Sequence, residues 1–148
     1  MKQLKDYTIY VFDLDNTLYL HKADKTYTCE YHKKVKDFLV DLKNNNKKLY
    51  IATHNLNPII YLNLINIQSS LFDGIIKETK YVNPIMNSIS EYTSKKDMVL
   101  EILNNNIDLT TDDVIFFDDH YFNIKEVESI NVKSIHVDQN KGINFNEI

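Results

Sequence analysis

Short apolar runs alternate with amphipathic segments along most of the chain. Five apolar runs of strand length predict strands over 7–12, 49–53, 72–76, 114–117 and 132–137. The segments between them predict helices over about 30–42, 55–67, 94–103 and 123–130; in the first, apolar residues recur at spacings of three and four. Asparagines at 44–46 and 104–106 follow two of these helices, and asparagine is the usual substitute for glycine at a left-handed helix end.

Strands that alternate with helices indicate right-handed crossovers and a parallel sheet covered on both faces. We therefore predict an α/β protein with a three-layer, Rossmann-like fold and a central parallel sheet of about five strands. No repeat, linker or low-complexity arm divides the sequence, so residues 1–148 are expected to form one domain. In such sheets ligands bind beyond the carboxyl ends of the strands.

The composition excludes several functions. A formal net charge of -4 argues against a protein built mainly to coat nucleic acid. All 17 basic residues are lysines, so no site can use an arginine fork on phosphate, as a Cys-x5-Arg phosphatase does. Two glycines are too few for a Walker loop or a GxGxxG dinucleotide turn.

The apolar runs also bear on location. None approaches the roughly 18 residues that suggest a membrane span, and the N-terminus lacks the apolar core of a signal peptide. The single cysteine, Cys29, cannot form an internal disulfide. We expect a soluble, cytoplasmic protein with no membrane partner; its oligomeric state cannot be read from the sequence.

Polar side chains gather where the predicted strands end. The groups in question are Asp13, Asp15, Thr53, Asp118 and Asp119 at the strand ends, with Lys95 and Lys96 at a helix start. Clustered carboxylates repel one another unless a cation, a lysine or protonation compensates their charge. Mg²⁺ prefers a few carboxylate or carbonyl oxygens together with water and phosphate, which suits phosphoryl chemistry. The sequence therefore predicts a magnesium site at this edge of the sheet.

Four motifs in this order resemble those of the haloacid dehalogenase superfamily, in particular its small, capless magnesium-dependent phosphatases. The motifs read "FDLDNTLY", "IATHN", "SKKDM" and "VIFFDDHYFNI", and the similarity covers nearly the full length. The first and last motifs are specific together, whereas the middle two are weak alone. An acid at the second position after the nucleophile is the pattern of phosphatases in this superfamily, so Asp15 favours the hydrolysis of phosphate monoesters.

The resemblance implies a role for each matching residue. Asp13 would attack phosphorus and become a phosphoaspartate. Asp15 would protonate the leaving oxygen and then take a proton from the hydrolytic water. Thr53 would donate a hydrogen bond to the phosphoryl group. Lys95 would neutralise the nucleophile and the phosphoryl oxygens, with Lys96 as the alternative if the motif is shifted by one residue.

The same resemblance implies the metal ligands. Mg²⁺ would be held by the carboxylates of Asp13 and Asp119 and by the backbone carbonyl of Asp15, with Asp118 as support or a further ligand. Beyond the motifs, His54 and Asn55 either contact substrate or cap the next helix. His120 is expected to be exposed at a helix start, and Asn123 to support the acidic loop with a hydrogen bond.

Two segments depart from the pattern. Residues 77–93 are longer than in the small phosphatases and predict a small lid, a partner-binding segment or an extra helix without a role. Residues 19–29 have room for a flap hairpin but not for a cap domain. The site is therefore expected to be open to bulky phosphoesters, such as phosphoproteins, as well as to small molecules.

Alternative functions are an end-phosphatase for nucleic acids, which the acidic balance does not favour, and a non-catalytic module that is phosphorylated or binds phosphate. Response-regulator receivers place the phosphorylated aspartate after the third strand, whereas Asp73 precedes that strand here. The motif order therefore favours the hydrolase. The sequence does not name a substrate.

Overall fold

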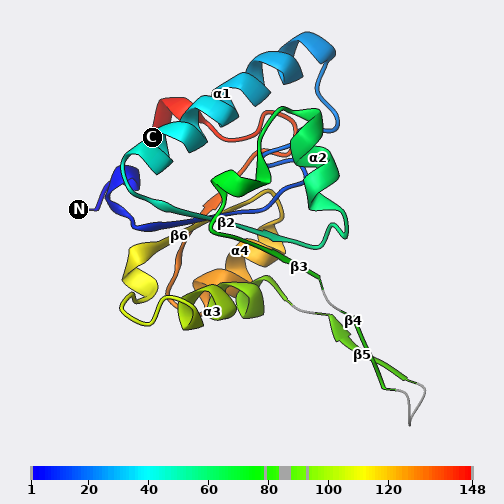
Figure 1. The fold of residues 1–148 in the computed structure, drawn as a ribbon, viewed down its shortest axis with the longest axis vertical. Coiled ribbons are helices and arrows are strands. Elements are labelled where there is room, and N and C mark those ends of the chain that lie inside the picture. The colour runs from blue at the N-terminus through cyan, green and yellow to red at the C-terminus, as the bar shows by residue number, and fades with distance from the viewer. Residues whose placement is uncertain (1, 79, 84–87, 93, 148) are drawn as a thin grey trace.

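Five parallel strands form the centre of the molecule in a computed structural model that describes residues 2–78, 80–83, 88–92 and 94–147. The strands are β1 (Ile9–Phe12), β2 (Lys48–Thr53), β3 (Gly74–Lys77), β6 (Val114–Asp118) and β7 (Lys133–His136). Their order across the sheet is β3-β2-β1-β6-β7, and each neighbouring pair is parallel. The predicted α/β class and five-stranded parallel sheet are confirmed (Figure 1).

Helices cover both faces of this sheet (Figure 1). They are α1 (Lys25–Asn44), α2 (Pro58–Leu64), α3 (Lys95–Asn104) and α4 (Tyr121–Glu128). Figure 1 shows α1 and α2 on one face and α3 and α4 on the other. Short 3₁₀ helices lie at Leu4–Asp6, Ser69–Leu71, Thr111–Asp113 and Phe145–Glu147. No helix among the described residues is long and apolar enough to cross a membrane.

The period of two along each strand divides the core into two layers. Phe12 and Phe117 stack with ring centroids 5.0 Å apart in the layer under α1, where Leu39 is also fully buried. Val11 and Phe116 belong to the opposite layer, against α3 and α4. Burying each of these side chains contributes about 1.5–3 kcal/mol, so the two layers hold the strand ends of the site in fixed register.

The segment after the first strand differs from the predicted flap. Helix α1 begins at Lys25, and the side chain of Asp24 caps it by accepting a hydrogen bond from the Tyr27 backbone N–H at 2.9 Å. Only residues 19–24 remain for the connection, and the described structure there holds an isolated bridge between Asp15 and Tyr19 instead of a hairpin. Because the helix already begins at Lys25, too few residues remain for a flap hairpin.

The long segment before α3 forms a two-stranded antiparallel pair. Strands β4 (Lys80–Asn83) and β5 (Ser88–Tyr92) form this hairpin, which projects from the body in Figure 1. Its backbone is thus extended and does not form the extra helix that was one of the three predictions. Residues 79, 84–87 and 93 of this segment lie outside the described part of the chain.

Asparagine supplies the left-handed turns. Four non-glycine residues have positive φ in the described structure, namely Asn16, Asn46, Asn66 and Asn131. The predicted left-handed end after the first helix is confirmed by Asn46 at φ 61°, whereas the α3 cap, Asn105, is right-handed. Asn16, at φ 60°, turns the chain directly after Asp15.

Candidate active site

The sheet register brings the polar strand ends together. Phe12 of β1 lies beside Ile51 of β2 and Phe117 of β6, so the residues that follow these three positions meet at one edge. The Asp13 backbone N–H donates to the Phe117 carbonyl at 2.8 Å, which continues the ladder by one residue. Asp13 is therefore held by the sheet itself while its side chain reaches beyond the strand.

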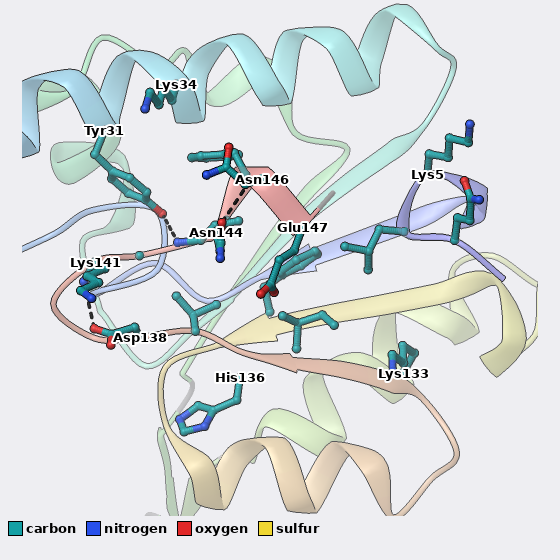
Figure 2. A pocket seen from close by; sticks show the side chains of 18 of the residues that line it. Lys5, Tyr31, Lys34, Lys133, His136, Asp138, Lys141, Asn144, Asn146 and Glu147 are labelled. Atoms are coloured by element: carbon teal, nitrogen blue, oxygen red, sulfur yellow. Dashed lines mark hydrogen bonds between the residues drawn. The ribbon is translucent and has the colours of Figure 1, made fainter. Parts of the chain in front are cut away.

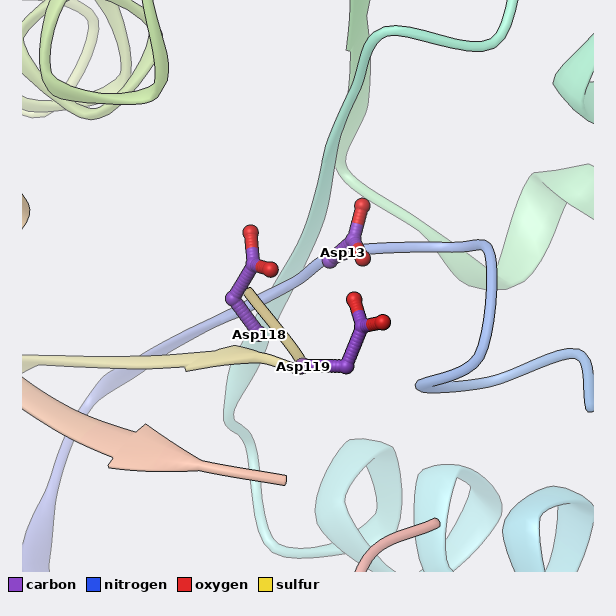
Figure 3. Close-up of side chains that lie close together, drawn as sticks. All are labelled: Asp13, Asp118 and Asp119. Atoms are coloured by element: carbon purple, nitrogen blue, oxygen red, sulfur yellow. The ribbon is translucent and has the colours of Figure 1, made fainter. Parts of the chain in front are cut away.

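Three carboxylates converge at this edge. Figure 3 shows the side chains of Asp13, Asp118 and Asp119 pointing toward one another from the ends of β1 and β6. One oxygen of each lies within 4.8 Å of the others. Ligands on an octahedral Mg²⁺ with bonds of 2.0–2.1 Å lie about 2.9 Å apart when adjacent and about 4.2 Å when opposite. Small side-chain movements therefore suffice for these residues to fit a magnesium ion.

Lys95 supplies a fixed positive charge in the cluster. Its side chain is 0% exposed, and its Nζ lies 2.7 Å from Asp13 Oδ1 and 2.9 Å from Asp118 Oδ2. A third hydrogen bond, 2.8 Å long, goes to the Ala52 carbonyl. Burial lowers the pKa of this ammonium, but the two carboxylates outweigh burial and raise the pKa above its ordinary value. Lys95 therefore stays charged.

The buried position of Asp13, next to Asp118, affects the pKa of its carboxyl group. Burial raises the pKa of its carboxyl well above the ordinary value, Lys95 opposes this, and the charge of Asp118 adds to it. The Thr17 hydroxyl donates to its other oxygen, Oδ2, at 3.4 Å. A further cation at the cluster would favour the ionised form that a nucleophile needs.

Asp118 is held rigidly and is fully buried. The His120 backbone N–H donates to its Oδ1 at 2.8 Å, and the Asn123 amide donates to its Oδ2 at 3.2 Å. The hydrogen bond predicted for Asn123 is thus present. Beside it, a ring nitrogen of His136 lies 2.9 Å from the Asp119 backbone carbonyl. The acidic loop is therefore fixed from both sides.

Asp15 lies apart from the buried cluster, and its side chain is 37% exposed. Its Oδ1 lies 2.7 Å from Nε2 of His21. The Asn55 side-chain amide donates to both carboxylate oxygens, at 3.4 and 3.3 Å. Asn55 also ties this carboxylate to β2, because its backbone N–H donates to the Thr53 hydroxyl at 3.0 Å.

Of the remaining predicted residues, some lie beside the acidic cluster and others make no contact with it. Thr53 is fully buried at the end of β2, next to Ala52, whose carbonyl binds Lys95. His54 is exposed and its Nδ1 faces Glu78 at 3.5 Å, away from the acidic cluster. Of the two lysines only Lys95 contacts the carboxylates, and Lys96 contributes its backbone N–H to a bond with Glu126.

Three neighbours of the site were not predicted: His21, Thr17 and His136. Thr17 lies in the first motif, four residues after Asp13, and that spacing is the only signal in the sequence. His21 and His136 have no local signal, because His21 reaches Asp15 through the turn at Asn16 and His136 reaches Asp119 across the sheet. Such contacts depend on the tertiary fold.

A cavity lies next to the acidic loop, and His136, which contacts the Asp119 carbonyl, is one of the residues that line it. It has a volume of about 1010 Å³ and is bounded by α1, β7 and the C-terminal segment (Figure 2). Lysines 5, 34, 133 and 141 are among the residues that line it, and the three converging aspartates are not. This cavity is therefore distinct from the carboxylate cluster.

The protein-family model described as "Acid Phosphatase" matches residues 26–148 of this chain. The chain belongs to the acid phosphatase family. The lysine and acidic motifs of this chain lie inside the matched region, whereas Asp13 and Asp15 precede it. No curated protein matches the sequence significantly.

Solved structures of haloacid dehalogenase-like proteins share the fold of this chain. A haloacid dehalogenase-like hydrolase from Streptococcus pneumoniae is 16% identical with a TM-score of 0.63, over 94% of this chain and 88% of that one. The phosphatase-containing N-terminal part of a Bacteroides fragilis protein, solved with Mg, is 14% identical with a TM-score of 0.69, over 97% of this chain and 39% of that one. A Clostridium difficile β-phosphoglucomutase is 14% identical with a TM-score of 0.55, over 95% of this chain and 86% of that one.

The chain therefore has the haloacid dehalogenase-like phosphatase fold, as its motifs suggested. At these identities the structural likeness establishes the fold alone, and a mutase shares that fold with hydrolases. The reaction and the roles of individual residues must be argued from the site.

Proposed function

We propose that this protein is a Mg²⁺-dependent phosphomonoesterase that works through a phosphoaspartate on Asp13. The observation that carries the proposal is the buried ammonium of Lys95 between Asp13 and Asp118, at 2.7 and 2.9 Å. A buried lysine shared by two acids favours the ionised form of a carboxylate, which burial opposes, and leaves positive charge where phosphoryl oxygens would arrive. Membership of the acid phosphatase family supports the same reaction class.

The reaction proceeds in two displacements. A carboxylate oxygen of Asp13 attacks phosphorus, the bond between phosphorus and the ester oxygen breaks, and Asp15 gives its proton to the leaving oxygen. Asp15 then takes a proton from a water molecule whose oxygen attacks the phosphoaspartate. Inorganic phosphate leaves, Asp13 is again a free carboxylate, and Asp15 again carries its proton.

The acidic cluster would hold the metal through the carboxylates of Asp13 and Asp119 and the backbone carbonyl of Asp15, with Asp118 as support. When bound, Mg²⁺ supplies positive charge for the phosphoryl oxygens. Asp118 is already engaged by Lys95, His120 and Asn123, so its part is to fix the loop that carries Asp119.

The other polar groups contact the substrate. Thr53 donates its hydroxyl to a phosphoryl oxygen, and Lys95 neutralises the charge that develops there. Asn55 donates to Asp15 and would therefore also contact the leaving group. His54, which faces Glu78, and Lys96 would make weaker contacts with the rest of the substrate. The phosphorylated substrate is a small molecule or a phosphoprotein that reaches the site without a cap, and nucleic acid ends remain the alternative.

The strand order argues against a receiver-type signalling module. Receivers have a parallel sheet of order 2-1-3-4-5. Counting only the strands of the parallel sheet, the order here is 3-2-1-4-5, since β6 and β7 are its fourth and fifth strands. A non-catalytic protein with this phosphatase fold is then the remaining rival, and turnover distinguishes it.

The test is hydrolysis of an aryl phosphate with and without Mg²⁺ by the native protein, Asp13→Asn and Asp37→Asn. Removing a covalent nucleophile is expected to lower kcat by about a thousandfold or more. Asp37 is an exposed acid of α1, so its variant controls for the loss of one charge and should retain native activity.

Native turnover that needs no metal, or an Asp13→Asn variant as active as Asp37→Asn, would refute the mechanism. No turnover by any of the three proteins on aryl phosphate, phosphosugars, nucleotides, phosphopeptides and oligonucleotide ends would favour the non-catalytic rival.

A further inference from the structure

His21 makes the shortest contact of the exposed acid at this site. Its Nε2 lies 2.7 Å from Asp15 Oδ1, and the His21 side chain is 35% exposed. The imidazole donates to an ionised carboxylate and accepts from a protonated one, so the pair can be hydrogen-bonded in both protonation states of Asp15. Asn55 approaches the same carboxylate at 3.3 and 3.4 Å, which leaves His21 as the stronger of its two side-chain partners.

Aromatic rings fix the imidazole in place. The His21 ring centroid lies 4.8 Å from that of Tyr19 and 5.7 Å from that of Tyr61. Tyr19 in turn packs edge-on against Tyr61 at 5.1 Å and stacks on His32 of α1 at 5.3 Å. The imidazole is therefore held between a residue of its own loop and a residue of α2.

A turn at Asn16 brings His21 back to Asp15. Asn16 is left-handed, its backbone N–H donates to the Tyr19 carbonyl at 2.6 Å, and its side-chain oxygen accepts from the His21 backbone N–H at 3.3 Å. The loop that replaces the expected flap thus brings a ring nitrogen six residues downstream onto the acid.

We infer that His21 is a positioning residue that holds the Asp15 carboxylate in the orientation needed to reach the leaving oxygen. This inference rests on the proposed function, in which Asp15 is the general acid. Proton transfer requires the acid to lie about 2.6–3.2 Å from the oxygen that it protonates. A carboxylate that is 37% exposed rotates freely unless something restrains it, and His21 restrains Oδ1.

Comparing esters with different leaving groups tests whether His21 positions the general acid. A nitrophenolate departs without help from an acid, whereas an alkoxide needs a proton, and general acids contribute about a hundredfold to ten thousandfold. We expect His21→Ala to lower kcat/KM about tenfold or more for an alkyl phosphate such as glycerol phosphate. For nitrophenyl phosphate, kcat/KM should fall by less than about threefold, because kcat/KM reports the first displacement and not the later hydrolysis of the phosphoaspartate, in which Asp15 acts as the base.

Matched variants separate positioning from packing. The side-chain nitrogen of glutamine can lie near the position of Nε2, so His21→Gln should restore most of the alkyl phosphate activity. Asparagine is too short to reach, and His21→Asn should behave as His21→Ala. Lys22→Ala, at the exposed next residue, controls for changes in the loop. In an Asp15→Asn background, His21→Ala should have no further effect on the alkyl ester.

Equal losses on both esters in His21→Ala, or an additive loss in the Asp15→Asn background, would overturn the role of His21 while leaving the phosphatase intact. A native protein with no activity on either ester would overturn the proposed function and this inference together. A selective loss on the alkyl ester, rescued by glutamine, would support the inference.

Discussion

Lys95 is the residue on which the arrangement of the site depends most. It brings an ammonium from the first turn of α3 to the ends of β1 and β6, and its hydrogen-bond partners are two carboxylates and a carbonyl. Removing one partner of a buried ion pair costs about 3–5 kcal/mol, because the other charge is left without compensation. Lys95 therefore contributes to folding as well as to the proposed reaction.

Replacing this lysine tests both contributions. In the absence of Mg²⁺, we expect Lys95→Met to lower the free energy of unfolding by about 3 kcal/mol or more, because Asp13 and Asp118 lose their shared cation. Lys96→Met, at the neighbouring half-buried position, should change it by less than about 0.5 kcal/mol. Urea unfolding of the two variants measures the difference, and equal losses would contradict the assignment.

The resemblance favoured Lys95 for this position and left Lys96 as the alternative. The motif order placed a lysine at the site, but Lys95 and Lys96 are adjacent in the chain and neither composition nor spacing separates them. Their positions differ by about 100° around α3, which buries one side chain between the carboxylates and turns the other away. His21 was missed for a related reason, because its contact with Asp15 depends on a turn with φ 60° at Asn16.

At the scale of elements, α1 supports the loop that carries the acid. His32 of this helix accepts a hydrogen bond at its Nε2 from the Leu20 backbone N–H at 3.1 Å. Tyr31, one residue earlier, donates its hydroxyl to the Thr17 carbonyl and accepts from the Ile143 backbone N–H. Helix α1 therefore holds the segment between Asp15 and Lys25 in place through hydrogen bonds to Thr17 and Leu20.

The burial of His32 makes the free energy of unfolding depend on pH. Burial, and then the nearby His21, lower the pKa of His32 below its ordinary value of 6.5. Between the folded pKa and 6.5 the unfolded chain binds more protons, so the free energy of unfolding falls as pH drops below about 6.5. His32→Gln keeps an acceptor but does not titrate, and it should flatten this part of the profile.

Urea unfolding between pH 5 and pH 8 measures the effect. His120→Gln, at an exposed histidine, is the control and should keep the native slope. A slope that is the same in His32→Gln as in the native protein would mean that other groups cause the acid sensitivity.

Element positions followed well from periodicity, and element ends did not. The five strands of the sheet lie where the apolar runs predicted them, because strands of a parallel sheet covered on both faces are continuous apolar runs. Helix α1, however, starts at Lys25 because Asp24 caps it, and α2 is confined to Pro58–Leu64. The hairpin of β4 and β5 carried no clear pattern, which is why three alternatives remained for it.

At the scale of the whole molecule, metal binding and folding are linked. A ligand that binds only the folded chain stabilises it by RT ln(1 + [L]/Kd), about 2.7 kcal/mol at a hundredfold excess over Kd. The acidic cluster that would hold Mg²⁺ comes from the ends of β1 and β6 and is assembled only in the folded sheet. Unfolding therefore destroys the site.

We expect Mg²⁺ to raise the thermal midpoint of the native protein by several degrees, and a chelator to reverse the shift. Asp119→Asn should lose most of the shift, because one of the three converging carboxylates becomes a neutral amide. Asp37→Asn should keep all of it, since that acid lies on the exposed face of α1. Equal shifts in both variants would exclude the acidic cluster as the metal site.

The burial of Lys95 also has a consequence for chemical labelling. Among the lysines whose side-chain exposure the structure describes, which leaves out Lys80, it is the only buried one, so amine-reactive reagents that modify the surface lysines do not reach it in the folded protein. Its modification requires α3 to separate from the strand ends, and the rate of labelling then follows the population of that opened state. The proposed catalytic amine is thereby a built-in probe of how often the site opens, readable by mass spectrometry without any knowledge of the substrate.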